Sequence, residues 1–204
     1  MREEIQALKR ERIVAEAVRL FYQRGYTGTT LDDIAAALGV TKPFIYTYFA
    51  SKADLLAAVC LPTIEMSLGA VATAVEGGGT HTGRLRRAIE DVTRVVLRRQ
   101  AEIAIFFREE KQIAPDMLHR IDALRERFDR VLAGLLADGV KAGEFALADT
   151  DLASLALGGM ISWSYTWHRP HGRLSADALA VRMADLALGM VRAREPESAS
   201  GPMA

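Results

Sequence analysis

Apolar residues recur at helical spacing along most of the chain. Residues 2–24 carry the first apolar stripe, which consists mainly of Ile5, Leu8, Ile13, Ala17, Leu20 and Phe21. The same spacing predicts further helices at residues 82–99, 101–112, 115–141, 149–168 and 175–194. No long run alternates apolar with polar residues, as a half-buried strand would. The pattern therefore predicts an all-α fold.

A more specific pattern lies between Thr29 and Lys52. It predicts two short helices joined by a turn, and the first has an apolar face formed by Leu31, Ile34, Ala35 and Leu38. Either Thr29 or Thr30 can cap the first helix. Gly39 can adopt the left-handed conformation that often follows a helix, and Pro43 falls in the first turn of the second helix. This is the layout of a helix-turn-helix, whose second helix enters the major groove of DNA.

A longer helix is predicted from Ser51, whose side chain can cap it together with Asp54. Pro62 lies inside the apolar run of this helix. Because proline removes a backbone hydrogen bond and clashes with the preceding turn, we expect a kink or a break there. The helix should resume to about Glu76, before a run of three glycines at 77–79 that indicates a loop.

These elements divide the chain into a helix-turn-helix DNA-binding domain at residues 1–52, a larger helical domain at 53–194, and a flexible tail at 195–204. The last two helices have apolar faces wider than a chain of this size needs to cover. We therefore expect a partner subunit to cover part of them. The residues assigned to this interface are Leu152, Leu155, Gly159, Leu179, Met183, Leu186 and Met190.

Composition and charge agree with an intracellular DNA-binding protein. The 204 residues include 26 Lys and Arg and 26 Asp and Glu, but residues 1–52 hold eight basic against six acidic side chains. A small excess of basic side chains in this N-terminal segment is sufficient for DNA binding, because only the surface that contacts DNA must neutralise phosphates. The single cysteine, Cys60, excludes an internal disulfide and suits a reducing cytoplasm. We find no secretory signal and no apolar run of the ~20 residues that span a membrane, so we expect a cytoplasmic protein with no membrane partner.

Several short motifs together carry a resemblance to a known family. They are Ala17 and Phe21 before Gly25-Tyr26, Thr29-Thr30-Leu31 before Ile34-Ala35, Gly39-Val40-Thr41, Ile45-Tyr46-Thr47-Tyr48-Phe49, and Ser51-Lys52-Ala53-Asp54-Leu55-Leu56. With these motifs, residues 10–56 resemble the DNA-binding domain of the TetR (tetracycline repressor) family of bacterial regulators. The resemblance implies a homodimer that binds a double-stranded DNA operator. It also implies an all-helical C-terminal domain that binds a small-molecule effector and then releases the DNA.

The candidate DNA-binding residues lie on the second short helix and on both sides of it. They are Thr30, Thr41, Lys42, Pro43, Phe44, Tyr46, Thr47, Tyr48 and Lys52. Helical spacing directs Ile45 and Phe49 to the core and leaves Tyr46 ambiguous. Thr30 and Thr41 stand at helix starts, where backbone N–H groups suit a phosphate. Phe44 departs from the small residue frequent in the family, and its ring could meet a thymine methyl group or pack against a sugar.

A second motif, Trp163-x-x-x-Trp167 followed by Arg169 and Pro170, resembles a subset of TetR regulators whose effectors are acyl-CoA thioesters. A tunnel lined by aromatic and apolar side chains would suit an acyl chain, and arginines could meet the phosphates of CoA. The candidate ligand-binding residues are Phe106, Phe107, Met160, Trp163, Trp167 and Arg169, with an arginine-rich face at Arg87, Arg94 and Arg98. Alternatively, the tryptophans belong to the core or the dimer interface, and the arginines are simply solvated.

Other chemistry finds little support in the chain. His168 and His171 lack nearby acidic or cysteine partners for a metal, and the adjacent Glu109 and Glu110 point about 100° apart on a helix. Neither a Gly-x-Ser-x-Gly motif nor a dinucleotide-binding glycine pattern is present. We therefore expect no catalytic site, metal or cofactor. The expected function is a ligand-responsive DNA-binding regulator, with a multidrug-sensing regulator of efflux genes as the alternative and a small helical enzyme as a remote one.

Overall fold

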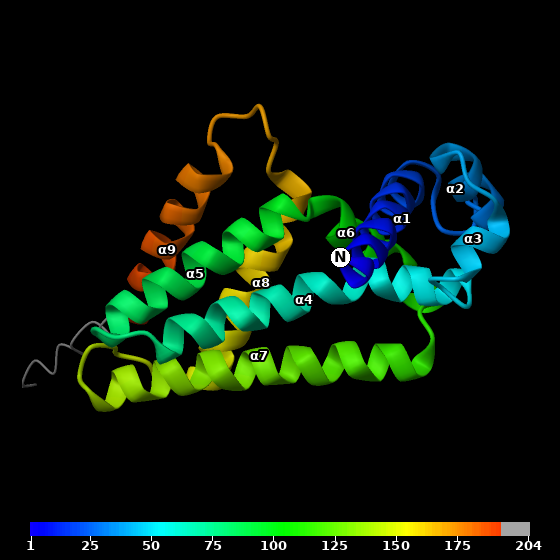
Figure 1. Ribbon diagram of the computed structural model, residues 1–204. Coiled ribbons are helices and arrows are strands. Elements are labelled where there is room, and N and C mark those ends of the chain that lie inside the picture. The colour runs from blue at the N-terminus through cyan, green and yellow to red at the C-terminus, as the bar shows by residue number, and fades with distance from the viewer. Residues whose placement is uncertain (193–204) are drawn as a thin grey trace, which may run out of the picture.

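The computed structural model describes residues 1–192, and this part of the chain is helical with no strands, which confirms the predicted all-α class (Figure 1). Residues 193–204, which include the end of the last predicted helix and the predicted tail, lie outside the described residues. The elements are α1 (Arg2–Arg24), α2 (Leu31–Leu38), α3 (Lys42–Tyr46), α4 (Lys52–Glu76), α5 (His81–Arg98), α6 (Gln100–Glu109), the 3-10 helix η1 (Glu110–Gln112), α7 (Pro115–Lys141), α8 (Thr150–Trp167) and α9 (Ala176–Arg192). Helices α1 to α3 form one end of the molecule, and the long helices α4, α5 and α7 run away from it (Figure 1).

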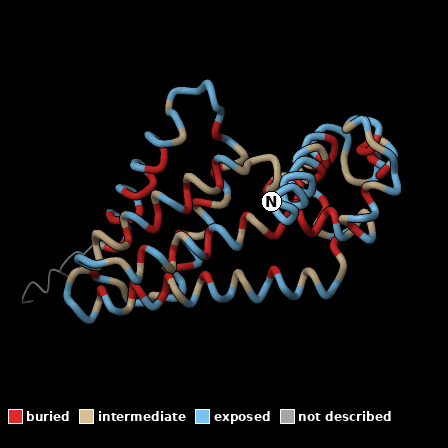
Figure 2. The backbone as a smooth tube through the Cα atoms, in the orientation of Figure 1, coloured by how far each residue is buried: buried red, intermediate tan, exposed pale blue. Residues whose placement is uncertain are grey.

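The buried side chains form two hydrophobic cores. The N-terminal core joins α1, α2 and α3 to the first half of α4, and it also includes Ile105 and Phe106 of α6 and Ile121 of α7. The bundle core joins the second half of α4 to α5, α7, α8 and α9. Figure 2 shows buried positions between the helices of both parts and exposed positions along their outer sides. Helices α4, α6 and α7 contribute to both cores. The cores therefore do not separate at residue 52, and the domain boundary proposed there remains a prediction.

The predicted helix starts and turns of the helix-turn-helix are confirmed. The Thr30 hydroxyl accepts a hydrogen bond from the backbone N–H of Asp33 at 3.1 Å, and the Asp33 carboxylate accepts one from the N–H of Thr30 at 2.7 Å. Gly39 adopts the left-handed conformation with φ 67°. Ser51 accepts from the N–H of Asp54 at 3.0 Å at the start of α4. Each local signal in the sequence therefore corresponds to a contact that defines a helix end.

The expected break at Pro62 does not occur, because α4 continues as one helix from Lys52 to Glu76 (Figure 1). Most neighbours of Pro62 on α4 are buried, including every residue from Leu55 to Leu61. Burial of an apolar face contributes more to helical stability than the hydrogen bond that proline removes. By length and composition α4 could also cross a membrane, contrary to the sequence-based expectation, but 61% of its apolar window is buried inside the protein, as in a core helix.

The first turns of α1 correct another expectation. Ile5 and Leu8 were assigned to the apolar stripe, but both side chains are exposed, whereas Ile13, Ala17, Leu20 and Phe21 are buried. The N-terminal core begins at Ile13 on α1, so Ile5 and Leu8 do not belong to it. Helical spacing alone does not show where along a helix its packing partner begins.

Helix α5 begins at an acidic cap that comes from a distant part of the chain. The Glu144 carboxylate accepts hydrogen bonds from the backbone N–H groups of His81 at 3.1 Å and Thr82 at 2.9 Å, and it contacts His81 Nδ1 at 2.8 Å. These hydrogen bonds, with that to Thr82 the largest cause, lower the pKa of Glu144 from 4.5 to about 2. The ionised carboxylate therefore fastens the loop after α7 to the start of α5.

This cap gives the folded protein a defined pH dependence. Because the pKa of Glu144 is lower in the folded than in the unfolded chain, its stabilisation is complete above pH 4.5 and is lost as the pH falls through about 2. We expect Glu144→Gln to lower the melting temperature at pH 7, and the difference from wild type to narrow as the pH is lowered from 4.5. Thermal unfolding at several pH values measures this difference. Glu126→Gln, which alters an exposed glutamate 3.6 Å from Arg130, should show no such convergence.

Candidate nucleic-acid interface and pocket

Helix α3 presents a polar and aromatic surface to solvent. Thr41, Lys42, Pro43, Tyr46 and Thr47 are exposed. The inward positions of Ile45 and Phe49 are confirmed, since both side chains are buried in the N-terminal core. The ambiguous Tyr46 proves to be 49% exposed. The outer surface of α3 is therefore free to enter a groove of the size that admits a helix.

Phe44 and Tyr48 are more enclosed than their assignment to the outer side of α3 implied. Both side chains are half-buried against the N-terminal core, and their ring centroids lie 5.2 Å apart. The ammonium group of Lys9 on α1 lies 5.9 Å from the Phe44 ring. Phe44 thus fills the junction of α1 and α3, and part of its ring remains accessible beside the exposed residues of α3.

The candidate phosphate-binding side chains already have partners within the protein. The Lys42 ammonium contacts the Asp32 carboxylate at 2.7 Å, and this hydrogen bond raises the pKa of Lys42. The Thr30 hydroxyl donates to Asp33 at 2.6 Å. Both pairs are exposed, and exposed ion pairs contribute little to stability. A phosphate can therefore replace Asp32 as the partner of Lys42 at small cost.

Lys52 holds the turn between α1 and α2. Its ammonium group donates hydrogen bonds to the carbonyl oxygens of Tyr26 at 2.8 Å and Thr29 at 2.9 Å, and it lies 4.0 Å from the Tyr26 ring centroid. The sequence placed Lys52 only among the candidate DNA-binding residues. The structure adds a positioning role, because these contacts fix the start of α4 against the turn that precedes α2.

A second set of contacts joins α6 to the end of α1, and we call it the α6–α1 clamp. The Arg108 guanidinium donates to the carbonyl oxygens of Phe21 and, at 3.2 Å, of Tyr22. The buried carboxylate of Glu109 accepts from the Tyr26 N–H at 3.1 Å and from Arg108 Nε at 2.9 Å. The sequence analysis considered Glu109 only as a poor catalytic group, because no local pattern connects residues more than 80 positions apart.

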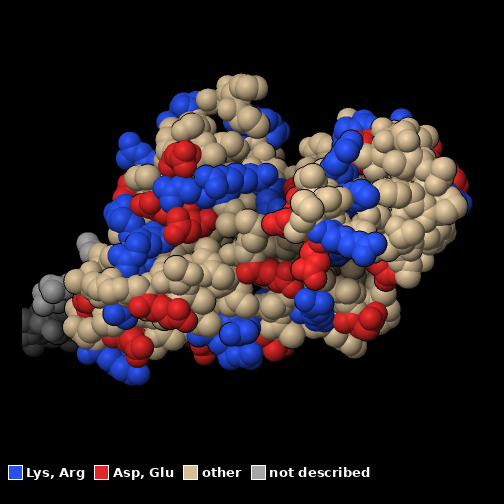
Figure 3. All heavy atoms as spheres, in the orientation of Figure 1, with Lys and Arg blue, Asp and Glu red and all other residues tan. Residues whose placement is uncertain are grey.

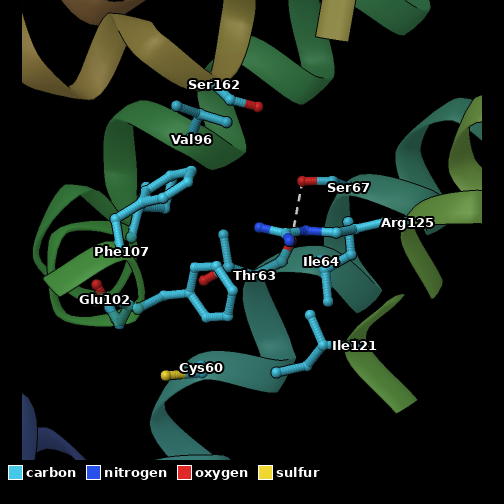
Figure 4. Close-up of a pocket in the computed structure, with 12 residues that line it drawn as sticks. Cys60, Thr63, Ile64, Ser67, Val96, Glu102, Phe107, Ile121, Arg125 and Ser162 are labelled. Atoms are coloured by element: carbon cyan, nitrogen blue, oxygen red, sulfur yellow. Dashed lines mark hydrogen bonds between the residues drawn. The ribbon is translucent and has the colours of Figure 1, made fainter. Parts of the chain in front are cut away.

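A cavity of about 90 Å³ lies where α4, α5, α6, α7 and α8 meet (Figure 4). Its lining residues are Cys60, Thr63, Ile64, Ser67, Val96, Glu102, Ile103, Phe106, Phe107, Ile121, Arg125 and Ser162. Phe106 and Phe107 thus line this cavity, in agreement with their expected place in a ligand pocket. Arg125 was missed, since nothing in the sequence distinguishes it from the other arginines of its helix.

Four other candidate ligand residues do not line this cavity, and their assignment to a ligand site stays a prediction. Met160 is half-buried outside it, Trp163 and Trp167 are 59% and 51% exposed, and Arg169 is exposed on the turn after α8. The buried side of α8 carries Ser154, Leu157, Ile161 and Ser164 instead. Because α8 is apolar on several sides, its sequence does not show which side faces inward.

The arginine-rich face is also more occupied than expected. Arg94 contacts Glu90 at 3.0 Å, Asp91 at 2.9 Å and Asp177 at 3.0 Å. Arg87 donates to the Gly78 carbonyl oxygen at 2.7 Å, whereas Arg98 is exposed. Figure 3 shows acidic side chains beside the basic ones over this part of the molecule. The charge of Arg94 is therefore largely neutralised by carboxylates of the protein.

The candidate interface residues fall into two groups. Leu152, Leu155, Gly159, Leu186 and Met190 are exposed on α8 and α9. Leu179 and Met183 are instead buried in the bundle core, which corrects their assignment to a partner subunit. They lie on the side of α9 that packs against α5, and periodicity could not separate that side from the outer one.

No group of three or more His, Cys, Asp and Glu side chains that could hold a metal occurs among residues 1–192. His168 is buried, and its Nδ1 lies 3.3 Å from Nε2 of Gln100. His171 is exposed on the turn between α8 and α9.

Comparisons with known proteins agree with this geometry. The family described as "Bacterial regulatory proteins, tetR family" matches residues 13–59, and "Tetracyclin repressor-like, C-terminal domain" matches residues 78–191. The transcriptional repressor KstR2 of Rhodococcus jostii is 25% identical over 182 residues, which cover 88% of this chain and 89% of that protein.

Solved structures show the same arrangement. The regulator PfmR from Thermus thermophilus is 31% identical with a TM-score of 0.80, over 87% of this chain and 97% of that one. AibR, crystallised with isovaleryl coenzyme A and operator DNA, is 27% identical with a TM-score of 0.74, over 89% and 97% of the two chains. The chain therefore belongs to the TetR family, whose members are DNA-binding transcriptional regulators and not enzymes.

Proposed function

We propose that the protein is a homodimeric, cytoplasmic repressor that binds a palindromic operator and releases it when a small effector occupies the cavity. The observation that carries this proposal is the place of the cavity between the two cores. Its wall includes Cys60, Phe106 and Ile121 from the N-terminal core and Val96 and Ile103 from the bundle core. A ligand there contacts both cores, so its binding free energy can depend on how α1 to α3 are placed.

The α6–α1 clamp supports the same proposal. Phe106 and Phe107 line the cavity, and Arg108 and Glu109 follow directly on α6 and bind the end of α1. A displacement of α6 by a ligand is therefore transmitted through hydrogen bonds to the turn that precedes α2. This arrangement supplies the two-state element that an effector needs to shift the population away from the DNA-binding form.

For DNA contacts we propose the exposed residues of α3, with Thr30 and Lys52 on either side. Tyr46, Thr47 and Pro43 are accessible for base and sugar contacts, and Thr41 and Lys42 for phosphates. The accessible parts of Phe44 and Tyr48 lie beside them and suit a thymine methyl group or a sugar. In a dimer, two such helices would read half-sites about one DNA turn, ~34 Å, apart.

Tyr46→Ala tests this surface with little risk to the fold. The side chain is half exposed and lies outside the N-terminal core, so its removal should leave the melting temperature nearly unchanged. We expect affinity for an operator selected with the wild-type protein to fall about tenfold or more, as one lost base contact costs about 1–3 kcal/mol. Fluorescence anisotropy measures this affinity. Tyr22→Ala, at an exposed tyrosine on α1, is the matched control, and equal operator affinity of the Tyr46 variant and the control would refute the assignment.

For the dimer interface we propose the exposed apolar surface of α8 and α9. Its members are Leu152, Leu155, Gly159, Leu186 and Met190, with Trp163 and Trp167 on the same helices. A single exposed leucine is common in a monomer, but several large apolar side chains exposed on α8 and α9 are more than a monomer usually leaves in water. Two copies that pair through this surface would bury it and fix the separation of their α3 helices.

The double substitution Leu155→Glu and Leu186→Glu tests this interface. Both leucines are exposed in the single chain, so the fold of each subunit should persist. Association of two variant subunits would bury the introduced glutamates, which opposes dimer formation. We expect a monomer in light scattering coupled to size-exclusion chromatography, together with loss of operator binding. Leu8→Glu, at an equally exposed leucine of α1, should remain dimeric. A double variant that still elutes as a dimer places the interface elsewhere.

As effector class we propose an acyl-CoA thioester. The complex of AibR with isovaleryl coenzyme A and the resemblance of the Trp163–Trp167 motif support this choice. Trp167, Arg169 and Arg173 also line a surface hollow of about 310 Å³ at the turn after α8, where a nucleotide end could lie. The alternative, a multidrug sensor, needs an unpaired acidic group, but Glu102 in the cavity is paired with Arg99 at 3.2 Å.

A panel of short-chain acyl-CoAs, free acids and cationic drugs separates the two classes. We expect acyl-CoAs to raise the melting temperature and to release the operator, because they would bind the DNA-free form preferentially. Differential scanning fluorimetry and fluorescence anisotropy measure the two effects on the same samples. A response confined to cationic drugs would instead favour a multidrug-sensing regulator of efflux genes.

A further inference from the structure

The wall of the cavity between the two cores carries one positively charged side chain. Its ionisable side chains are Cys60, Glu102 and Arg125. Burial raises the pKa of the Cys60 thiol to about 12, so this group is neutral near pH 7. Glu102 is paired with Arg99 at 3.2 Å, and both of these side chains are mostly buried. Arg125 therefore supplies the charge that a ligand in the cavity would meet.

Arg125 is held in place by aromatic rings and not by a close carboxylate. Its guanidinium carbon lies 4.5 Å from the Phe106 ring centroid and 6.0 Å from that of Phe107. Within the described part of the chain its recorded ion pair is with Asp122, at the long distance of 3.8 Å. Asp129, one turn farther along α7, is close enough for Arg125 to lower its pKa, but burial has the larger effect and raises it. Neither carboxylate satisfies the planar N–H groups of Arg125.

The direction of the side chain is visible in Figure 4. Arg125 projects from α7 into the space between Phe107 on α6 and the turn of α4 that carries Thr63 and Ser67. The Ser67 hydroxyl donates to the Thr63 carbonyl oxygen at 2.8 Å, and Arg99 donates to the Thr63 hydroxyl at 3.0 Å. Stacking on an aromatic face leaves the edge of a guanidinium free to donate two parallel hydrogen bonds. An oxygen-bearing group in the cavity would meet that edge.

The size and lining of the cavity limit the rest of the ligand. A dry apolar cavity of ~150 Å³ accommodates benzene, whereas this cavity measures about 90 Å³. Side chains of Ile64, Val96, Ile103 and Ile121 supply much of its wall. The space therefore suits a small apolar group.

We propose that Arg125 holds the carbonyl end of the effector: the cavity takes a small acyl group, and the guanidinium donates hydrogen bonds to its carboxylate or thioester oxygen. This inference refines the proposed function and rests on it for the choice of the cavity as the effector site. It makes Arg125 the residue that selects acyl compounds and rejects amines of the same shape. A carboxylate and a thioester both offer a carbonyl oxygen that accepts hydrogen bonds from a guanidinium. The experiment below distinguishes the two ligands, because it titrates the free acid and the thioester separately.

The test is direct calorimetric titration of the full-length protein without DNA. The ligands are 3-methylbutanoate, 3-methylbutylamine, the CoA thioester of 3-methylbutanoate and CoA alone. We expect the acid or its thioester to bind at least tenfold more tightly than the amine. If the thioester is the ligand, it should also bind at least tenfold more tightly than CoA alone. Arg125→Ala should lower the affinity for the acyl compound about tenfold or more, which is the effect expected from the loss of a charge-assisted hydrogen bond. Binding of the acid identifies a free acid as ligand, and binding of the thioester alone identifies the thioester.

Two further variants control for structure. Arg127→Ala removes an exposed arginine from the same helix and should bind as wild type does. Arg125→Lys keeps the charge but not the planar fork, so it should bind the acyl compound more weakly than wild type even if Arg125→Ala fails to fold. Equal binding of acid and amine, binding of none of the ligands, or unchanged binding by both Arg125 variants would overturn the proposal. If the acyl compound binds through Arg125 but does not release the operator, the site stands and the proposed release mechanism is wrong.

Discussion

Helix α4 contributes buried side chains to both hydrophobic cores, and the place of the helix-turn-helix depends on this shared helix. Residues from Leu55 to Leu61 pack with α1 to α3, and residues from Leu68 to Ala74 pack with the bundle. Because protein interiors are close-packed, neither half of α4 can move without repacking its own core. A change in the bundle is therefore transmitted to the N-terminal helices through a rigid element.

Polar contacts then fix the orientation of the N-terminal helices around one turn. The turn between α1 and α2 receives Lys52 from α4 and Glu109 from α6, and both groups bind backbone atoms of Tyr26. Thr29 adds a buried hydroxyl that donates to the Gly25 carbonyl oxygen at 2.9 Å. Charged groups bound to backbone atoms in a partly buried site are directional, so they specify an angle that apolar packing alone would leave loose. This turn is therefore the point at which α4 and α6 both contact the connection between α1 and α2.

The cavity lies close to these contacts, which is why we propose that a ligand bound there would act on the DNA-binding helices. Phe106 belongs to the N-terminal core, lines the cavity and stacks with Arg125. Two residues farther along the same helix, Arg108 binds the carbonyl oxygens at the end of α1. A single helical turn of α6 therefore joins the cavity, the N-terminal core and the clamp.

Local sequence signals by themselves determined the helix ends and the exposed side of α3. Thr30 with Asp33, Gly39, Pro43 and Ser51 each act within a few residues, so their hydrogen bonds and backbone angles could be predicted from the sequence. The inward positions of Ile45 and Phe49 followed from helical spacing for the same reason. The predicted bounds of α7, from Pro115 to Lys141, were confirmed because a proline and a long apolar stripe mark them.

Only the tertiary structure decided which side of each apolar helix faces inward and which distant groups meet. Trp163 and Trp167 lie outside the cavity and Met183 inside the core, although all three belong to helices with apolar residues on several sides. Arg125 and the α6–α1 clamp gave no sequence signal, because their partners are brought together by packing of separate helices. Pro62 stays helical for a related reason, since burial of the surrounding turns outweighs its local preference. Periodicity shows that a helix has an apolar side, and only the packing of its neighbours selects the partner.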